Sequence, residues 1–102
     1  MSKSDPFCVV YTKPFGSKFY KEYGRTETIK NNHNPKFTKK ITMPFAFEEV
    51  QPLMFEIYDE DSKRPNLDDH DFLGYAECFL AELINEGRVS MTCVFEKNRR
   101  PS

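Results

Sequence analysis

Short stretches of apolar residues recur along the chain, and turn-forming residues separate them. In the clearest stretch, Leu53 to Tyr58, every second residue is apolar, so Leu53, Phe55 and Ile57 share one face of a predicted strand. Phe7 to Tyr11 is continuously apolar, which is typical of a strand that is buried on both faces. The pattern therefore predicts strands before it predicts helices.

Four further regions complete the predicted elements. The remaining predicted strands are Phe19 to Tyr23 and Thr26 to Lys30 (a pair around Gly24), Lys36 to Phe45, Phe72 to Phe79, and Val89 to Glu96. Leu80, Leu83 and Ile84 have helical spacing, and Gly87 is placed to end a short helix. Six or seven short strands with one short helix predict an all-β, antiparallel β-sandwich.

Composition narrows the class of protein. The 102 residues suffice for one domain, expected over residues 1–96, followed by a polar tail over 97–102. The formal net charge of −1 argues against a nucleic-acid binder. No run of about 18 apolar residues predicts a membrane span. Cys8, Cys78 and Cys93 lack the spacing of a disulfide framework or a zinc site, which favours a reducing, cytoplasmic setting.

Acidic residues crowd the segment from Asp59 to Asp71, which carries six acids against two bases. Hard, oxygen-seeking cations, Ca²⁺ above all, are the usual partners of such a cluster. Asp59 and Asp61 lie two apart at a strand end, so both side chains can turn toward one side of the loop. Asp71 opens the next strand at the same rim, and Asp5, just before another strand, is placed to supply a fourth carboxylate.

Other interpretations of the acidic segment were weighed. An EF-hand beginning at Asp59 fails because Lys63, Arg64 and His70 would stand at positions that need an oxygen ligand, glycine and glutamate. Paired carboxylates also serve glycoside hydrolysis, but nothing places an acid and a base around a substrate, so we expect no enzymatic activity. A solvated acidic loop without a ligand remains the plain alternative.

Several segments match a known family in order. They are Ser2-Lys3-Ser4-Asp5-Pro6-Phe7, Gly24-Arg25-Thr26-Glu27, Ile29-Lys30-Asn31-Asn32 with Asn34-Pro35-Lys36-Phe37, Phe47-Glu48-Glu49-Val50-Gln51, and the loop from Tyr58-Asp59 through Asp61 to Asp71-Phe72-Leu73-Gly74. On these segments, over residues 2–86, the chain resembles a C2 domain and, more closely, the first C2 domain of a copine.

The resemblance implies an eight-stranded Greek-key sandwich that binds acidic phospholipid membranes in a Ca²⁺-dependent way. It implies a cytoplasmic protein that calcium recruits to the plasma membrane. The ligand positions of the family map onto Asp5, Asp59, Asp61 and Asp71. Asp68 and Asp69 have no place in that pattern.

One departure from the family affects these expectations. A complete domain has a first strand and a further ligand aspartate ahead of the Ser-Lys-Ser-Asp-Pro motif, so the chain resembles a domain truncated at that strand. We therefore expect weakened calcium binding and an open sheet edge that favours self-association. The alternative functions are a calcium-independent protein-interaction module and a truncated product with impaired calcium binding.

Basic residues supply the candidate lipid contacts. Lys63 and Arg64, near the loop tip, are placed to touch headgroups. A second basic face, where related domains bind phosphoinositides, would comprise Arg25, Lys30, Lys36 and Lys40. Simple solubility is the alternative for both groups.

Overall fold

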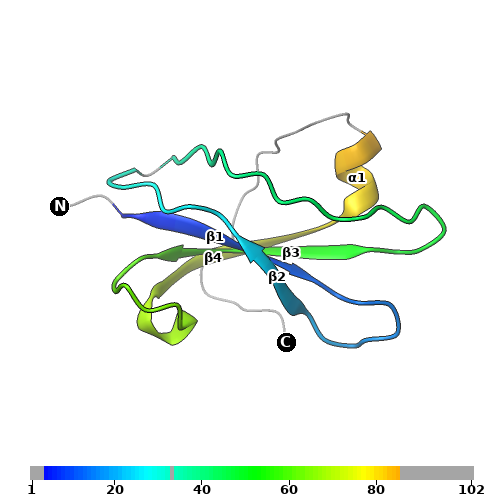
Figure 1. Cartoon of the computed structure of the whole chain (residues 1–102), viewed down its shortest axis with the longest axis horizontal. Coiled ribbons are helices and arrows are strands. Elements are labelled where there is room, and N and C mark those ends of the chain that lie inside the picture. Colours follow the sequence, from blue (N-terminus) through cyan, green and yellow to red (C-terminus); the bar gives the residue numbers. More distant parts are fainter. Residues whose placement is uncertain (1–3, 33, 86–102) are drawn as a thin grey trace.

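Four strands and one short helix form the framework of the molecule. The computed structural model describes residues 4–32 and 34–85. The elements are β1 (Pro6–Thr12), β2 (Lys21–Arg25), β3 (Pro52–Asp59), the 3₁₀ turn η1 (Leu67–Asp69), β4 (Asp71–Phe79) and α1 (Leu80–Asn85). All paired strands are antiparallel, in the order β2-β1-β3-β4 (Figure 1). The predicted all-β, antiparallel class with one short helix is confirmed.

The main hydrophobic core lies on one face of the sheet, beneath the acidic loop. Its buried members are Phe7, Val9 and Tyr58, and Tyr11, Leu67 and Phe72 pack against them. The rings of Phe7 and Tyr58 stack at 5.7 Å between centroids, and Phe72 meets Tyr58 edge-on at 5.6 Å. Because Phe7 and Tyr58 lie opposite one another near the ends of β1 and β3, this core fixes the strand ends from which the acidic loop departs.

The two faces of β3 are buried differently from what its pattern suggests. The buried side chains are Leu53, Met54, Glu56 and Tyr58, whereas Phe55 and Ile57 are only half-buried. Glu56 is tolerated inside because it accepts a hydrogen bond from the Tyr58 hydroxyl at 2.7 Å. Burial, reinforced by Glu56, raises the pKa of Tyr11 on the same face.

Two predicted elements are wrong. Gly24 does not separate two strands but lies inside β2, opposite Val10, next to a register shift at which β2 carries one extra residue, Tyr23. The Ile41 side chain lies over Gly24, 3.5 Å from the position that a Cβ would take, which is an ordinary van der Waals distance.

Residues 36–45 form no strand in the structure. The backbone N–H groups of Thr38 and Lys39 donate to the carboxylate of Glu27 at 2.8 and 3.2 Å, so a side chain takes bonds that a strand ladder would use. Gly87 and the strand predicted over Val89 to Glu96 lie outside the described residues.

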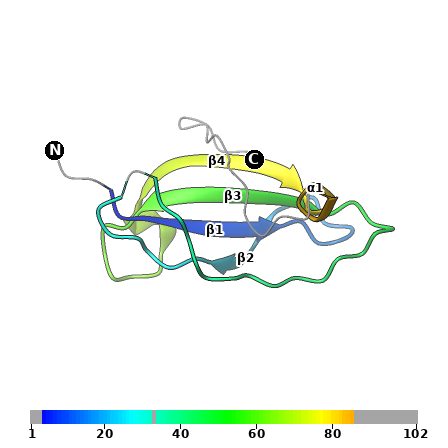
Figure 2. The same ribbon diagram turned by 90° about the horizontal axis from the view of Figure 1, so that it is seen from above.

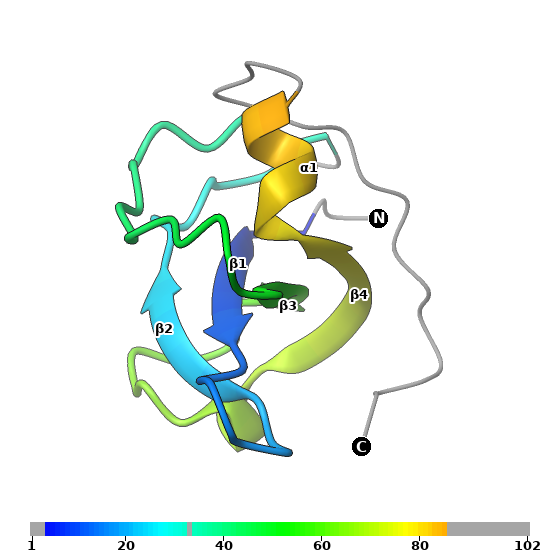
Figure 3. The ribbon, with the colours of Figure 1, turned by 90° about the vertical axis from the view of Figure 1, so that its right-hand side faces the viewer.

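Connecting segments cover the sheet on both sides and at both ends. The segment between β2 and β3 runs along one side, together with α1, and the loop that carries η1 lies on the other side (Figures 1 and 3). The loop from β3 to β4 is at one end of the strands, and the β1–β2 loop is at the opposite end (Figure 2). In the described part of the chain, no helix is long and apolar enough to cross a bilayer.

Candidate metal centre

Three carboxylates converge at the mouth of the loop between β3 and β4. Asp59 ends β3 and lies directly opposite Asp71, which begins β4, because the two strands are antiparallel neighbours. Asp61 follows two residues after Asp59. One oxygen from each of the three carboxylates lies within 4.8 Å of the others, and the group is partly to fully exposed. Strand pairing thus brings together side chains that are up to 12 residues apart in the sequence.

The electrostatics of this group favour a cation. Desolvation, together with the charges of Asp71 and Asp59, raises the pKa of Asp61 above its usual value. The two lysines that reach the loop, Lys30 and Lys63, approach the carboxylate of Glu60 at 3.8 and 3.9 Å. The three aspartates therefore repel one another in a way that a bound cation would relieve.

The donor set fits Ca²⁺. Carboxylates are hard oxygen ligands, Ca²⁺ takes six to eight of them in flexible geometry, and three carboxylates offer six oxygens. The exposure of Asp61 and Asp71 leaves room for water or a phosphate group beside them. Neither histidine nor thiol belongs to the group, so a softer metal is disfavoured.

Asp5 lies next to this group and is hydrogen-bonded to it through its backbone. Its backbone N–H donates to Oδ1 of Asp59 at 2.8 Å, and its backbone carbonyl accepts the Glu60 N–H at 2.9 Å. Its own Oδ1 accepts the N–H of Asn31 at 2.8 Å. Asp5 is not among the three carboxylates brought together in the described part of the chain, so its place as a ligand stays a prediction.

His70 holds the loop from inside. Its side chain is buried, and its ring meets Phe7 edge-on at 5.1 Å. Nδ1 accepts the backbone N–H of Asp61 at 3.1 Å, so a neutral ring carries its hydrogen on Nε2 and donates it to the carbonyl of Arg64, 2.9 Å away. One imidazole therefore bridges the loop backbone at a candidate ligand and at the loop tip.

Arg25 holds the same loop from β2. Its guanidinium donates to the carbonyl of Pro65 at 2.8 Å, pairs with Glu22 and lies over the ring of Phe7. Composition and spacing do not point to the roles of Arg25 and His70. Their only sequence signal is that each side chain can offer several hydrogen bonds to a loop that lacks regular structure.

The basic candidates differ in exposure and in the contacts they make. Lys63 is almost fully exposed at the loop tip, and Arg64 is exposed beside it. Of the second set, Arg25 is turned into the acidic loop and Lys30 approaches Glu60. Lys36 and Lys40 are exposed on the segment that follows Pro35. A common basic face made of these four residues stays a prediction.

Comparison with known proteins identifies the family. The model of the C2 domain family matches residues 1–93. Nicotinic receptor-associated protein 1 of Caenorhabditis briggsae is 46% identical, over an alignment that covers 82% of this chain and 16% of the relative. The protein of the same name from Caenorhabditis elegans is 45% identical with the same coverage, so the chain spans about a sixth of the length of these relatives.

C2 domains are typically non-enzymatic modules that bind membranes or proteins, and many bind Ca²⁺. On the family match and the all-β fold together, the chain belongs to the C2 domain family.

Proposed function

We propose that this chain is a calcium-dependent phospholipid-binding module of the copine type, which acts in the cytoplasm and is recruited to the acidic surface of the plasma membrane. The observation that carries the proposal is the convergence of Asp59, Asp61 and Asp71 at one rim. Three exposed carboxylates at that spacing repel an anionic membrane unless a cation offsets their charge.

The residues at the rim have different proposed roles. Asp59, Asp61 and Asp71 would hold Ca²⁺, and Asp59 is oriented by the N–H of Asp5. When bound, Ca²⁺ supplies positive charge and coordination positions for a lipid phosphate. Lys63, exposed at the loop tip, adds direct attraction to anionic headgroups, worth about 1 kcal/mol for a basic residue near the surface.

Sedimentation with phosphatidylserine vesicles, in calcium and in chelator, tests this function. The wild-type chain should sediment with vesicles more strongly in calcium than in chelator. Asp61→Asn should lose that response, since it removes a ligand charge without touching the hydrogen bond between Asp5 and Asp59. Asp68→Asn makes the same change in the same loop, outside the three-carboxylate group, and should behave as wild type. Sedimentation that the chelator does not alter would refute the calcium requirement.

A calcium-independent protein-interaction module is the second candidate. Two observations favour it: β2 and β4 are the outer strands of the described sheet, and the relatives are named for association with a receptor. An outer strand is a template for a partner strand, or for self-association with a second copy. If the chain binds no vesicles in either condition, this candidate takes precedence.

A further inference from the structure

The loop between β1 and β2 carries a second charged surface, at the end of the sheet opposite the acidic rim (Figures 1 and 2). From Thr12 to Lys21 it contains three lysines and three aromatic residues but no acidic residue. Phe15 and Phe19 expose 89% and 73% of their surface. We call these ten residues the basic aromatic loop. The basic aromatic loop therefore has a positive formal charge, whereas the acidic rim has a negative one.

Local hydrogen bonds give the tip of this loop a defined shape. The N–H of Ser17 donates to the carbonyl of Pro14 at 2.8 Å, and Gly16 between them has φ = 82°, as the third residue of a type II turn requires. The Ser17 hydroxyl both accepts from the N–H of Phe19 and donates to its carbonyl. Phe15 and Phe19 are therefore exposed on a turn that is stabilised by its own hydrogen bonds.

The base of the loop is tied to the sheet. The ammonium of Lys13 lies 4.5 Å from the ring centre of Tyr20, and the Tyr20 hydroxyl donates to Glu77 in β4 at 2.9 Å. Lys18 and Lys21 remain exposed beside the two phenylalanines. The same short loop thus exposes two cationic side chains and two aromatic rings.

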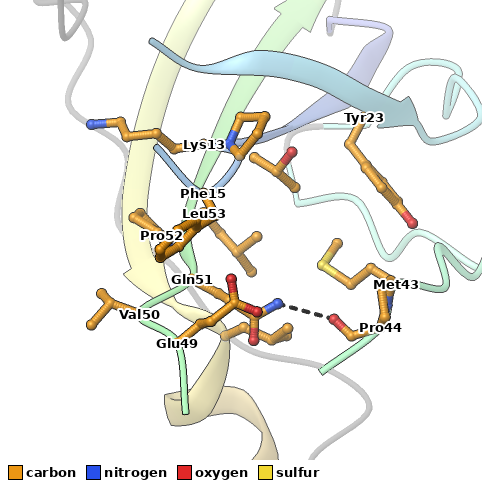
Figure 4. A pocket seen from close by; sticks show the side chains of 13 residues that line it. Lys13, Phe15, Tyr23, Met43, Pro44, Glu49, Val50, Gln51, Pro52 and Leu53 are labelled. Atoms are coloured by element: carbon orange, nitrogen blue, oxygen red, sulfur yellow. Dashed lines mark hydrogen bonds between the residues drawn. The ribbon is translucent and has the colours of Figure 1, made fainter. Parts of the chain in front are cut away.

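A neighbouring turn offers a contrast in charge. Phe15 lines a pocket of about 180 Å³ together with Glu49 and Val50 from the turn before β3 (Figure 4). In that turn Phe47 is 85% exposed, as prominent as Phe15, but two glutamates, Glu48 and Glu49, follow it. Both segments thus expose an aromatic ring, and of the two only the basic aromatic loop combines it with positive charge.

We propose that the basic aromatic loop binds an anionic phospholipid surface without calcium. Aromatic rings that enter the interfacial region, flanked by lysines that face anionic headgroups, are the physical requirements for such a contact. The occupant follows from charge complementarity, because three lysines without an acid favour an anionic surface over a neutral apolar one. The site uses none of the three aspartates, so this proposal can be tested independently of the calcium site. It gives the domain a second membrane contact at the other end of the sheet.

Vesicle sedimentation of the full chain in chelator tests this proposal. The wild type should bind vesicles of phosphatidylcholine with phosphatidylserine and should not bind phosphatidylcholine alone. Replacing Lys18 and Lys21 together by Gln should weaken binding about 25-fold, since each lysine contributes about fivefold at an anionic surface. Phe15→Ser with Phe19→Ser should weaken it at least about tenfold, because both rings lose apolar burial.

Phe47→Ser is the matched control: it removes an equally exposed aromatic ring from the acidic neighbour and should leave binding unchanged. Thermal unfolding of each variant confirms that the fold is retained. The proposal is overturned if the wild type does not bind anionic vesicles in chelator, or if Phe47→Ser weakens binding as much as the loop variants. It is also overturned if light scattering shows a dimer that the loop variants dissociate while vesicle binding is absent, because the surface would then join two copies of the chain.

Discussion

At the scale of single residues, His70 connects the hydrophobic core to the acidic rim. It contacts Phe7 on one side and bonds the backbone of Asp61 and Arg64 on the other. A neutral imidazole suits this place because it accepts one hydrogen bond and donates another within one rigid ring. The position of Asp61 in the carboxylate group therefore depends on a buried side chain that is not itself among the three carboxylates.

Removing that ring should loosen the loop. In His70→Ala the N–H of Asp61 and the carbonyl of Arg64 lose their partner, and we expect the free energy of unfolding to fall by about 2 kcal/mol. Hydrogen exchange at the Asp61 amide should accelerate. Asp68→Ala, an exposed change in the same loop, should alter stability by less than about 0.5 kcal/mol. Unchanged exchange at Asp61 would show that His70 does not hold the loop.

The hydrogen bonds of Glu27 should make the free energy of unfolding depend on pH. The Thr38 hydroxyl and backbone N–H both donate to its carboxylate, which lowers the pKa of Glu27 from 4.5 to about 2. Because the unfolded chain keeps the higher value, ionised Glu27 stabilises the fold above about pH 4.5, and this gain disappears as the pH falls toward 2. Urea unfolding of Glu27→Gln should therefore differ most from wild type at neutral pH, and the two curves should converge in acid. A difference that is constant with pH would contradict this role.

At the scale of elements, the central strands carry the stability of the sheet. Leu53 in β3 exposes 1% of its surface, whereas Val50, three residues earlier, exposes 76%. Leu53→Ala should lower the free energy of unfolding by about 2–5 kcal/mol, because it leaves a cavity. Val50→Ala should change it by less than about 0.5 kcal/mol. Chemical denaturation compares the two directly, and similar costs would show that this part of β3 is not core.

The strands that the sequence predicts correctly share one physical property. β1, β3 and β4 each contain a run of apolar residues, which is mostly buried in β1 and partly buried in β3 and β4, and the structure places them within a residue of the predicted bounds. The predictions for Gly24 and residues 36–45 are wrong because the structure there depends on distant partners: Gly24 pairs with Val10 of β1, and the Glu27 carboxylate binds the amides of Thr38 and Lys39. Local patterns do not encode such contacts.

The candidate site was likewise predictable only in part: local sequence indicated the carboxylates but not the residues that support them. Asp59, Asp61 and Asp71 were predictable because strand ends and a two-residue spacing determine where they lie. The supports were not, since His70 and Arg25 reach the loop through tertiary contacts with the backbone of other residues. Asp5 illustrates both cases, because its position beside Asp59 follows from strand pairing, whereas the bond from its carboxylate to Asn31 does not.

At the scale of the whole molecule, the domain has two ends of opposite charge. The acidic rim lies where β3 passes to β4, and the basic aromatic loop lies where β1 passes to β2, at the other end of the sheet (Figure 2). With the two sites together, calcium would add to a membrane affinity that already exists in its absence. The chain spans about a sixth of the length of these relatives.

A calcium titration followed by backbone amide NMR shifts tests whether the three aspartates at the rim bind Ca²⁺. We expect saturable shifts concentrated at Asp59, Asp61 and Asp71, which Asp61→Asn abolishes and Asp68→Asn preserves. Amide shifts that stay unchanged up to millimolar calcium, or that are centred on other residues, would contradict it.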